Sequence, residues 1–199
     1  MGPFMGKATE RLHREIIANQ VRIKTIRSGG SGTIIYSAQS GATFSTYAIT
    51  CHHVIADAIT VKNEWDPRVG RERKKEYRAL VSAEFFDYGN VEHGRRPLTY
   101  SADAEIIAYD STHDMALLKL RTVKKAEAVA ALPALESWKA VTIGTPVFAV
   151  GCALGHDPVL TDGLVTHMGD EIDYKDYIMA TAAIVFGNSG GAVFVDLDG

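Results

Sequence analysis

The stretch that most constrains the fold is "GNSGGAV" at residues 187–193, in which a lone serine, Ser189, is flanked by glycines. Apolar runs lie on both sides of it, "AAIV" at 182–185 and "AVFV" at 192–195. Glycine permits close backbone approach and unusual dihedral angles, so this run can direct backbone N–H groups toward one point. An ordinary turn has a similar composition, because Gly, Asn and Ser dominate turns. Ser189 is therefore a candidate nucleophile, and the rest of the chain has to supply its partners.

Short apolar runs fill most of the chain beyond residue 28, with turn residues between them. Many short strands with glycine-bearing turns favour an all-β sandwich or barrel over alternating strands and helices. The charged stretch "EWDPRVGRERKKEYR" at 64–78 interrupts the pattern. It is interpreted as a long exposed loop rather than a nucleic-acid patch, since basic runs are usually solvated. The apolar runs occupy residues 33–38, 46–51, 58–63, 77–86, 104–110, 115–121, 145–151, 163–168, 177–185 and 192–195.

A helical pattern precedes the strands. The segment "TERLHREIIANQ" at 9–20 places Leu12 and Ile16 at helical spacing, and Thr9 can cap its start. We therefore expect a short N-terminal helix and a lead-in over residues 1–27.

The composition is that of a globular protein and excludes several classes of function. The 199 residues are 46% hydrophobic, and the net charge of -3 gives no reason to expect nucleic acid as the main partner. No apolar run approaches the ~18 residues that a membrane helix needs, so no membrane partner is expected. Residues 1–20 contain no apolar leader segment, and Cys51 and Cys152 are too few for a disulfide framework. These features predict a reducing compartment and a cytoplasmic location.

Two patterns that would imply a cofactor or a metal ion are incomplete. "SGGSGT" at 28–33 resembles a phosphate-binding loop, but it lacks the lysine and leads into a strand-like run instead of a helix. Cys51, His52 and Cys152 have no recognisable zinc-ligand spacing. We therefore expect neither a cofactor nor a metal ion.

Acyl transfer by a serine requires a base within reach and a carboxylate that orients the base. "AITCHHVIADA" at 48–58 places two histidines at the end of an apolar run, before a short segment that can be helical. "YDSTHDMALLKL" at 109–120 places Asp114 directly before a strongly apolar run. Burying a carboxylate there is costly without a partner, and an imidazole N–H would supply one. The two segments are therefore the candidate partners of the serine.

Together these three segments resemble the trypsin-like (chymotrypsin-fold) serine peptidases, specifically the bacterial HtrA/DegP-like branch. That branch has T-N-x-H-V-[IV] around its base, D-[LI]-A-[LV]-L-K after its carboxylate and G-N-S-G-G-[PA] around its nucleophile. The matching stretches here are "TCHHVI", "DMALLK" and "GNSGGA", and the similarity runs from about Ser28 to the C-terminus. The resemblance implies a peptidase domain over 28–199, with a first β-barrel over about 28–125 and a second over about 140–199.

The resemblance also implies the catalytic roles. His53 is the base, Asp114 orients it and Ser189 is the nucleophile of a serine endopeptidase that acts on protein or peptide substrates through an acyl-enzyme. Adjacent residues of a strand point to opposite faces, so His52 cannot address the same serine, and His113 is set aside in the same way.

The turn around the nucleophile is expected to bind the oxyanion. It comprises Gly187, Asn188 and Ser189, with the N–H groups of Gly187 and Ser189 as the chief donors. Digestive relatives have an aspartate before the serine, which pairs with a newly freed N-terminus, and the neutral Asn188 cannot form that ion pair. We therefore expect any regulation to come from loop rearrangement or from assembly, as a homo-oligomer or with a regulatory partner.

The substrate pocket is expected to include Ala183, Ile184 and Val185. These residues bring no charge, and an unpaired buried cation is costly, so the sequence predicts a preference for aliphatic side chains.

Three features depart from the family pattern. The segment between base and carboxylate is longer than usual, with the surplus in 64–100, and Phe186 stands where a polar residue or a proline is expected. Only residues 190–199 follow the serine, whereas the family's second barrel has further strands there, so we expect that barrel to be incomplete. Two alternatives to an active endopeptidase follow. One is a catalytically impaired binding or scaffolding domain, and the other is a protease fragment completed by another chain.

Overall fold

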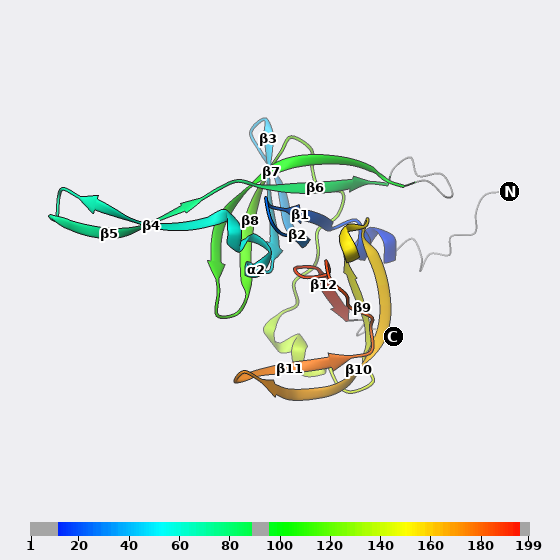
Figure 1. Cartoon of the computed structure of the whole chain (residues 1–199). Helices are drawn as coiled ribbons and strands as arrows, with labels where there is room; N and C mark the ends of the chain where they lie inside the picture. The colour runs from blue at the N-terminus through cyan, green and yellow to red at the C-terminus, as the bar shows by residue number, and fades with distance from the viewer. Residues whose placement is uncertain (1–11, 89–95, 196–199) are drawn as a thin grey trace.

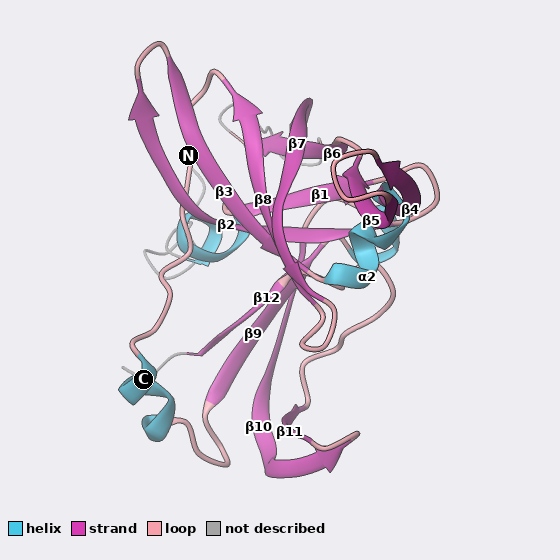
Figure 2. Ribbon diagram, turned by 90° about the vertical axis from the view of Figure 1, so that its left-hand side faces the viewer, coloured by secondary structure: helices cyan, strands magenta, loops and turns pink. Residues whose placement is uncertain are grey.

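The computed structural model describes residues 12–88 and 96–195, and strands make up most of this part of the chain (Figure 1). Two β-structures of unequal completeness lie one above the other (Figure 2). The all-β class with two barrels, expected from the sequence, is confirmed.

The first β-structure is a closed antiparallel barrel in which β6 pairs back onto β1. Alternate residues of β8, namely Ala116, Leu118 and Leu120, are buried, because successive side chains of a strand point to opposite faces. They share the core with Val21 and Ile23, which are fully buried. In barrel order the strands are β1 (Gln20–Lys24), β2 (Gly29–Ser40), β3 (Thr43–Thr50), β8 (Met115–Thr122), β7 (Leu98–Asp110) and β6 (Val81–Asp87).

The first barrel begins earlier than the sequence indicates, because β1 lies within the segment 1–27 assigned to a helix and lead-in. Polar and apolar residues alternate along β1, and the strand pairs with both β2 and β6. Within the described residues the helix expected over 9–20 is limited to η1 (His13–Ile17), since Gln20 already belongs to β1. Its expected cap, Thr9, lies outside the described residues.

The second β-structure is an open four-stranded sheet, equivalent to half a barrel. Its strands are β9 (Pro146–Gly151), β10 (Val159–Ile172), β11 (Lys175–Ala180) and β12 (Ala192–Val195), in the order β11-β10-β9-β12. Its core is small, and large apolar side chains of β10 and β11 remain exposed, among them Leu164, Ile172 and Met179. The incomplete second barrel expected from the sequence is therefore confirmed.

A two-stranded ribbon projects from the first barrel and contains the stretch 64–78, for which the sequence indicates a loop (Figure 1). It consists of β4 (Ile59–Asp66) and β5 (Arg71–Arg78), which pair in a continuous antiparallel register. The expected exposure of 64–78 is correct, but the expected irregular backbone is wrong. The cross-strand pair of Glu64 with Lys75, at 3.1 Å, is one of the contacts along the ribbon that a pattern of exposed charges does not reveal.

Short helical turns connect the strands. They are α2 (His52–Ile55) and η2 (Ala56–Ala58) after β3, η3 (Leu135–Ala140) between the barrels and η4 (Ala153–Gly155) after β9. In the described ranges, every helix falls short of the length and apolarity that crossing a membrane requires.

Candidate active site

His53 and Asp114 face each other where two neighbouring strands of the first barrel meet. The chain leaves β3 at Thr50 and enters α2, which carries His53, while Asp114 directly precedes β8. Because Thr50 pairs with Ala116 in the β3–β8 ladder, both side chains reach the same barrel edge. Asp114 Oδ1 accepts the His53 backbone N–H at 2.8 Å, and Oδ2 lies 2.7 Å from ring Nδ1. One carboxylate therefore holds both the backbone and the ring of the histidine.

The Asp114 carboxyl is stabilised in its ionised form. Burial opposes ionisation, but hydrogen bonds from the His53 backbone and ring, the nearby ring charge and the Cys51 thiol together hold the pKa of Asp114 below its usual value. Asp114 also has a φ of 54°, a left-handed conformation that is uncommon outside glycine. An ionised carboxylate at this place would keep the proton of the imidazole on Nδ1, which leaves Nε2 able to accept one.

The Cys51 thiol joins this pair to the second barrel. Its sulfur donates to the Asp114 carboxylate and accepts the backbone N–H of Gly190. Burial, followed by the charge of Asp114, raises the pKa of Cys51 to about 11, so the thiol remains a neutral donor at neutral pH. Cysteine, histidine and aspartate are also zinc-ligand types, and the ligand atoms of Cys51, His53 and Asp114 lie within 4.8 Å of one another. These described residues could hold a metal ion only by giving up the hydrogen bonds between them.

The turn around Ser189 is attached to the first barrel through Ser31 of β2. The Ser31 backbone N–H donates to the Ser189 carbonyl at 2.8 Å, and the Ser31 hydroxyl donates to the Gly187 carbonyl at 2.6 Å. The same hydroxyl accepts the backbone N–H of Cys152 at 2.7 Å. Three segments that are far apart in the sequence therefore meet at one buried serine.

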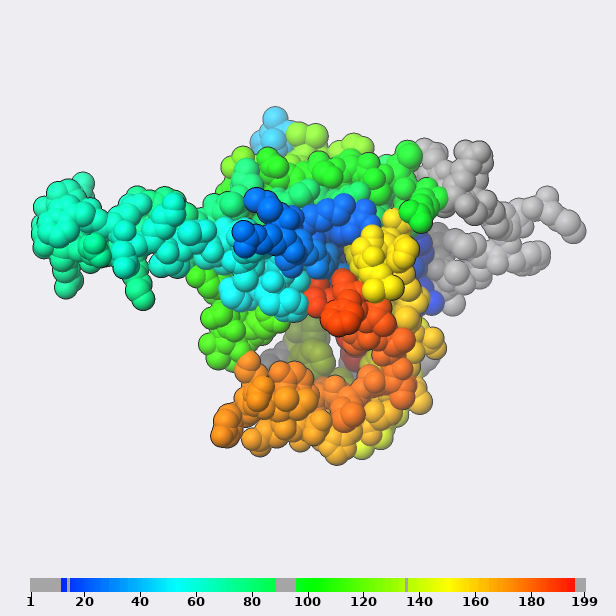
Figure 3. Space-filling view, in the orientation of Figure 1, coloured from blue at the N-terminus to red at the C-terminus, as the bar shows by residue number. Residues whose placement is uncertain are grey.

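Gly190 brings the serine turn onto the junction between β3 and α2. Its φ is 84°, and a Cβ at this position would lie 2.3 Å from the Thr50 hydroxyl and 2.9 Å from the Cys51 backbone nitrogen. Only glycine fits such an approach. Since Cys51 lies directly before α2, the candidate nucleophile Ser189 and the candidate base His53 occupy neighbouring segments from different barrels. In the space-filling view the red segment before β12 reaches the surface between the first barrel and the orange β10–β11 hairpin (Figure 3).

The backbone of the turn offers two unengaged donors. Among the described residues the N–H groups of Gly187 and Ser189 have no hydrogen-bond acceptor, whereas the Asn188 N–H donates to the Val185 carbonyl at 3.1 Å. Gly187 has a φ of 94°, and a Cβ there would lie 2.6 Å from the Cys152 carbonyl. Free N–H groups at such a turn are the kind of donor that stabilises a developing oxyanion.

The segment expected to form the substrate pocket leaves its strand early. β11 ends at Ala180, and the strand expected over 177–185 therefore continues as irregular backbone. Ala183, Ile184 and Val185 are all exposed, and the Ala183 carbonyl accepts the Thr161 hydroxyl at 2.9 Å. Beside this segment a hollow of about 250 Å³ is lined by residues of both barrels, including Arg22, Leu154, Phe186 and Gly187.

The family description "Trypsin-like peptidase domain" matches residues 30–199. The chain belongs to this family. The match includes the barrel strands from β2 onward and the segments that carry His53, Asp114 and Ser189.

Curated relatives place this trypsin-like peptidase domain in the HtrA/DegP-like branch. Periplasmic serine endoprotease DegP of Salmonella typhimurium is 26% identical over 174 residues, which are 85% of this chain and 28% of the relative. A probable periplasmic serine endoprotease, DegP-like, of Brucella suis is 36% identical over 100 residues, which are 49% of this chain and 19% of the relative. The chain thus spans less than a third of the length of these relatives.

Solved structures agree on the fold. The crystal structure of Deg5 superposes with a TM-score of 0.65 at 22% identity, covering 97% of this chain and 83% of that one. The serine endoprotease from Yersinia pestis gives a TM-score of 0.60 at 20% identity, covering 98% of this chain and 55% of that one.

The cytoplasmic location expected from the sequence is wrong, because the curated relatives of this trypsin-like peptidase are named periplasmic endoproteases. A leader is not part of a folded domain, and a domain of this size can build a sufficient core without disulfides. The compartment therefore cannot be inferred from the lack of an apolar segment in residues 1–20 or from the two unpaired cysteines.

The two histidines set aside in the sequence have other neighbours in the described chain. The His52 ring stacks on Tyr109 with centroids 5.0 Å apart, and His113 Nδ1 lies 2.6 Å from an Asp110 carboxylate oxygen. The backbone of His52 contacts the candidate site, through its N–H to the Asp114 carbonyl at 3.1 Å.

We expect His52→Ala to retain most peptidase activity, because alanine keeps the backbone N–H and loses only the stacking on Tyr109. The lost ring contact should cost about 1 kcal/mol of stability. Steady-state kcat/KM and thermal unfolding, compared with His53→Ala, check this expectation. An inactive His52→Ala beside an active His53→Ala would show that the base is assigned to the wrong histidine.

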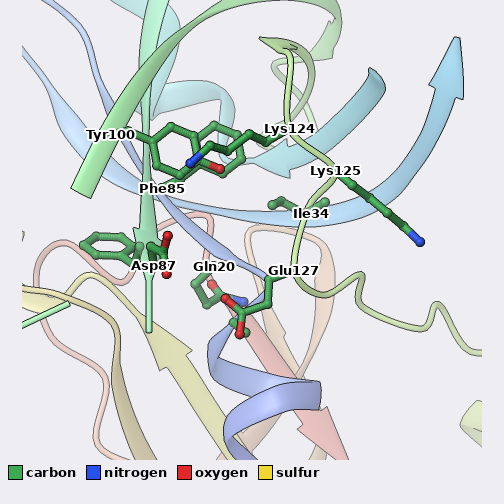
Figure 4. A pocket seen from close by; sticks show the side chains of 10 residues that line it. Gln20, Ile34, Phe85, Asp87, Tyr100, Lys124, Lys125 and Glu127 are labelled. Carbon is green, nitrogen blue, oxygen red and sulfur yellow. The ribbon is translucent and has the colours of Figure 1, made fainter. Parts of the chain in front are cut away.

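A second hollow, of about 120 Å³, lies in the first barrel and is lined by none of the candidate catalytic residues (Figure 4). The Phe85 and Tyr100 rings stack along it with centroids 4.8 Å apart, and the Lys124 ammonium lies 4.9 Å from the Tyr100 centroid. Lys125 and Glu127 complete its rim with charges of both signs. Its walls are thus held by their own stacking and cation–π contacts.

Sequence reasoning missed two residues of the candidate site. In the sequence, Ser31 lies in the stretch 28–33, which resembles an incomplete phosphate-binding loop, and Cys51 suggests only a disulfide or a metal ligand. A serine between glycines at the start of a strand is a weak signal, because the local pattern does not show which distant residues the serine bonds to.

Proposed function

We propose that this trypsin-like peptidase domain is a serine endopeptidase that hydrolyses peptide bonds through Ser189, His53 and Asp114. The observation that carries the proposal is the packing of the Ser189 turn, through Gly190, onto the junction that bears the hydrogen-bonded His53–Asp114 pair. Membership of the family and the similarity to DegP-like endoproteases support serine endopeptidase activity in general.

In this mechanism Ser189 Oγ attacks the carbonyl carbon of the scissile peptide while His53 Nε2 takes the hydroxyl proton. The oxyanion of the tetrahedral intermediate faces the N–H groups of Gly187 and Ser189, and each such donor is worth roughly 2.7–4 kcal/mol in comparable sites. His53 then gives its proton to the leaving amine, and the C–N bond breaks to leave an acyl-enzyme. Water, deprotonated by His53, hydrolyses the ester and restores the serine. Asp114 stays ionised throughout and stabilises the imidazolium.

A fluorophosphonate probe tests this function and separates it from the binding-domain alternative. The reagent phosphonylates only an activated serine, so intact-mass and peptide analysis should locate one adduct on Ser189. His53→Ala serves as the matched control, because it keeps the serine and removes its base. Equal labelling of the wild type and His53→Ala, or no labelling of the wild type, would contradict an active triad.

We also propose that the domain acts on proteins or peptides outside the cytoplasm. The support is the naming of the DegP relatives as periplasmic endoproteases. Regulation by assembly or by a partner remains a prediction drawn from the neutral Asn188.

The expected substrate preference is for aliphatic P1 residues such as Val, Ala or Leu. The exposed segment Ala183, Ile184 and Val185 carries no charge that could neutralise a buried Lys or Arg. A methylene more or less changes such a preference by only about 1–3 kcal/mol, so selection should be broad. A peptide-library digest with the full-length protein, read by mass spectrometry, measures it. Predominant cleavage after charged residues would contradict this pocket.

A further inference from the structure

We infer that Ser31 is a positioning residue that holds the oxyanion-binding turn through its side-chain hydroxyl. The inference rests on the peptidase function proposed above and adds a residue that the sequence does not connect with it. Ser31 belongs to β2 of the first barrel, and 156 positions separate it from Gly187 of the turn. It acts through the backbone of the turn rather than on the substrate itself.

Every polar group of Ser31 is engaged. The hydroxyl donates to the Gly187 carbonyl at 2.6 Å and accepts the Cys152 N–H at 2.7 Å. The backbone N–H donates to the Ser189 carbonyl at 2.8 Å, and the backbone carbonyl accepts the Thr50 hydroxyl at 2.7 Å. Since the residue is fully buried, these bonds form away from competing water.

Two hydrogen bonds, of which Ser31 supplies one, fix the peptide planes on either side of Gly187. In the plane before it, the Phe186 carbonyl accepts the Leu154 N–H at 2.7 Å. A trans peptide directs its N–H opposite to its C=O, so this bond turns the Gly187 N–H to the other side. In the plane after it, the Gly187 carbonyl is held by the Ser31 hydroxyl. Glycine at a φ of 94° has no side chain to resist a peptide flip, so these two bonds supply the resistance.

The site has little room for a water molecule to take the place of the hydroxyl. A Cβ on the adjacent Gly151 would lie 2.8 Å from Ser31 Oγ, which shows how closely the backbone surrounds this oxygen. Removing the hydroxyl therefore leaves the Gly187 carbonyl and the Cys152 N–H without their partner in a buried place, an arrangement that favours movement of the turn.

The first experiment compares Ser31→Ala with Ser37→Ala on the same strand. Ser37 is a matched control, because its hydroxyl also accepts a backbone N–H, that of Ala126 at 3.1 Å, but lies outside the candidate site. We expect Ser31→Ala to lower kcat by roughly 10- to 100-fold with little change in KM, less than the 10²- to 10³-fold loss of a whole oxyanion donor. Ser37→Ala should keep kcat within about twofold. Equal kcat values for the two variants, or a change confined to KM, would overturn the inference.

A second measurement does not depend on activity. In the Ser189→Ala background, we expect Ser31→Ala to speed amide hydrogen exchange at Cys152 and at Asn188, while exchange along β8 stays unchanged. The Asn188 N–H belongs to the peptide whose carbonyl the Ser31 hydroxyl holds, and it donates to the Val185 carbonyl. If the wild type hydrolyses no peptide, the proposed function fails, yet this exchange still decides the role of Ser31, and unchanged exchange would refute it.

A third variant covers the case in which Ser31→Ala does not fold. In Ser31→Cys a thiol replaces the hydroxyl with weaker hydrogen bonds and a modest increase in size. We expect this variant to fold and to show a smaller fall in kcat with an unchanged KM. A folded Ser31→Cys with the kcat of the wild type would overturn the inference.

Discussion

Ser189→Ala is expected to lower kcat for peptide hydrolysis by about 10⁶, the scale on which removal of the nucleophile acts in serine peptidases. Alanine cannot form the acyl-enzyme, so what remains is the residual rate that oxyanion donors and substrate binding provide over water. The fold should persist, because Ser31 and Gly190 hold the turn through the backbone and need no contact from the Ser189 hydroxyl. Single-turnover and steady-state assays with a peptide ester and a protein substrate measure the loss.

Ser101→Ala is the control for Ser189→Ala, since Ser101 lies exposed on β7 of the first barrel. It should have the activity of the wild type. Loss of fluorophosphonate labelling must accompany the loss of hydrolysis in Ser189→Ala. A variant that still hydrolyses peptide at a tenth of the wild-type rate would mean that another residue is the nucleophile.

Asp114→Asn is expected to lower kcat by about 10⁴, the scale of the corresponding change in the trypsin-like template. The carboxylate accepts hydrogen bonds from the His53 backbone N–H at 2.8 Å and from the ring at 2.7 Å. An asparagine oriented to accept the backbone N–H turns its amide N–H₂ toward Nδ1. The proton of the neutral imidazole then moves to Nε2, which can no longer accept a proton from Ser189. Steady-state kinetics measure the loss, and KM should change little because both carboxylate oxygens are engaged by His53.

Asp110→Asn provides a matched control for Asp114→Asn. Asp110 lies near the same turn and also pairs with a histidine ring, that of His113, at 2.6 Å. Its hydrogen bonds hold the pKa of Asp110 at about 2, mainly through His113 and the backbone N–H groups that follow, so it too is ionised at neutral pH. Asp110→Asn should retain activity within about threefold. The opposite result would assign the orienting role to Asp110.

Ser31 is not alone in connecting the catalytic turn to the first barrel, because Arg22 also makes contacts at the interface between the barrels. Arg22 of β1 contacts the Gly155 carbonyl beside the turn and pairs with Glu84 of β6 at 2.5 Å. Burial opposes ionisation of Glu84, but the hydrogen bonds and charges of Lys24 and Arg22 hold the pKa of Glu84 below its usual value. The pair is therefore ionised at neutral pH, and its stabilising effect is lost as the pH falls through that lowered pKa.

Local pattern alone predicted much of the fold. The strongly apolar run at 115–121 identifies β8 without any knowledge of its neighbours, and similar runs mark most other barrel strands. The run at 58–63 marks the first part of β4, but the end of β4 and all of β5 could not be predicted as strands, because both faces of the ribbon are exposed and its order comes from cross-strand pairing. β1 was not predicted, because the helical pattern expected over 9–20 extends to its first residue, Gln20.

The sequence by itself determined the family and the candidate catalytic residues. The motifs around His53, Asp114 and Ser189 each combine a reactive side chain with the local backbone that positions it. Each motif can therefore be recognised from a few consecutive residues. What only the tertiary structure decided is how the segments hold one another, as when Ser31 bonds to Gly187 across 156 positions. A hydrogen bond depends on the distance between two atoms in the folded protein. The residues between them in the sequence do not show which distant residues come that close.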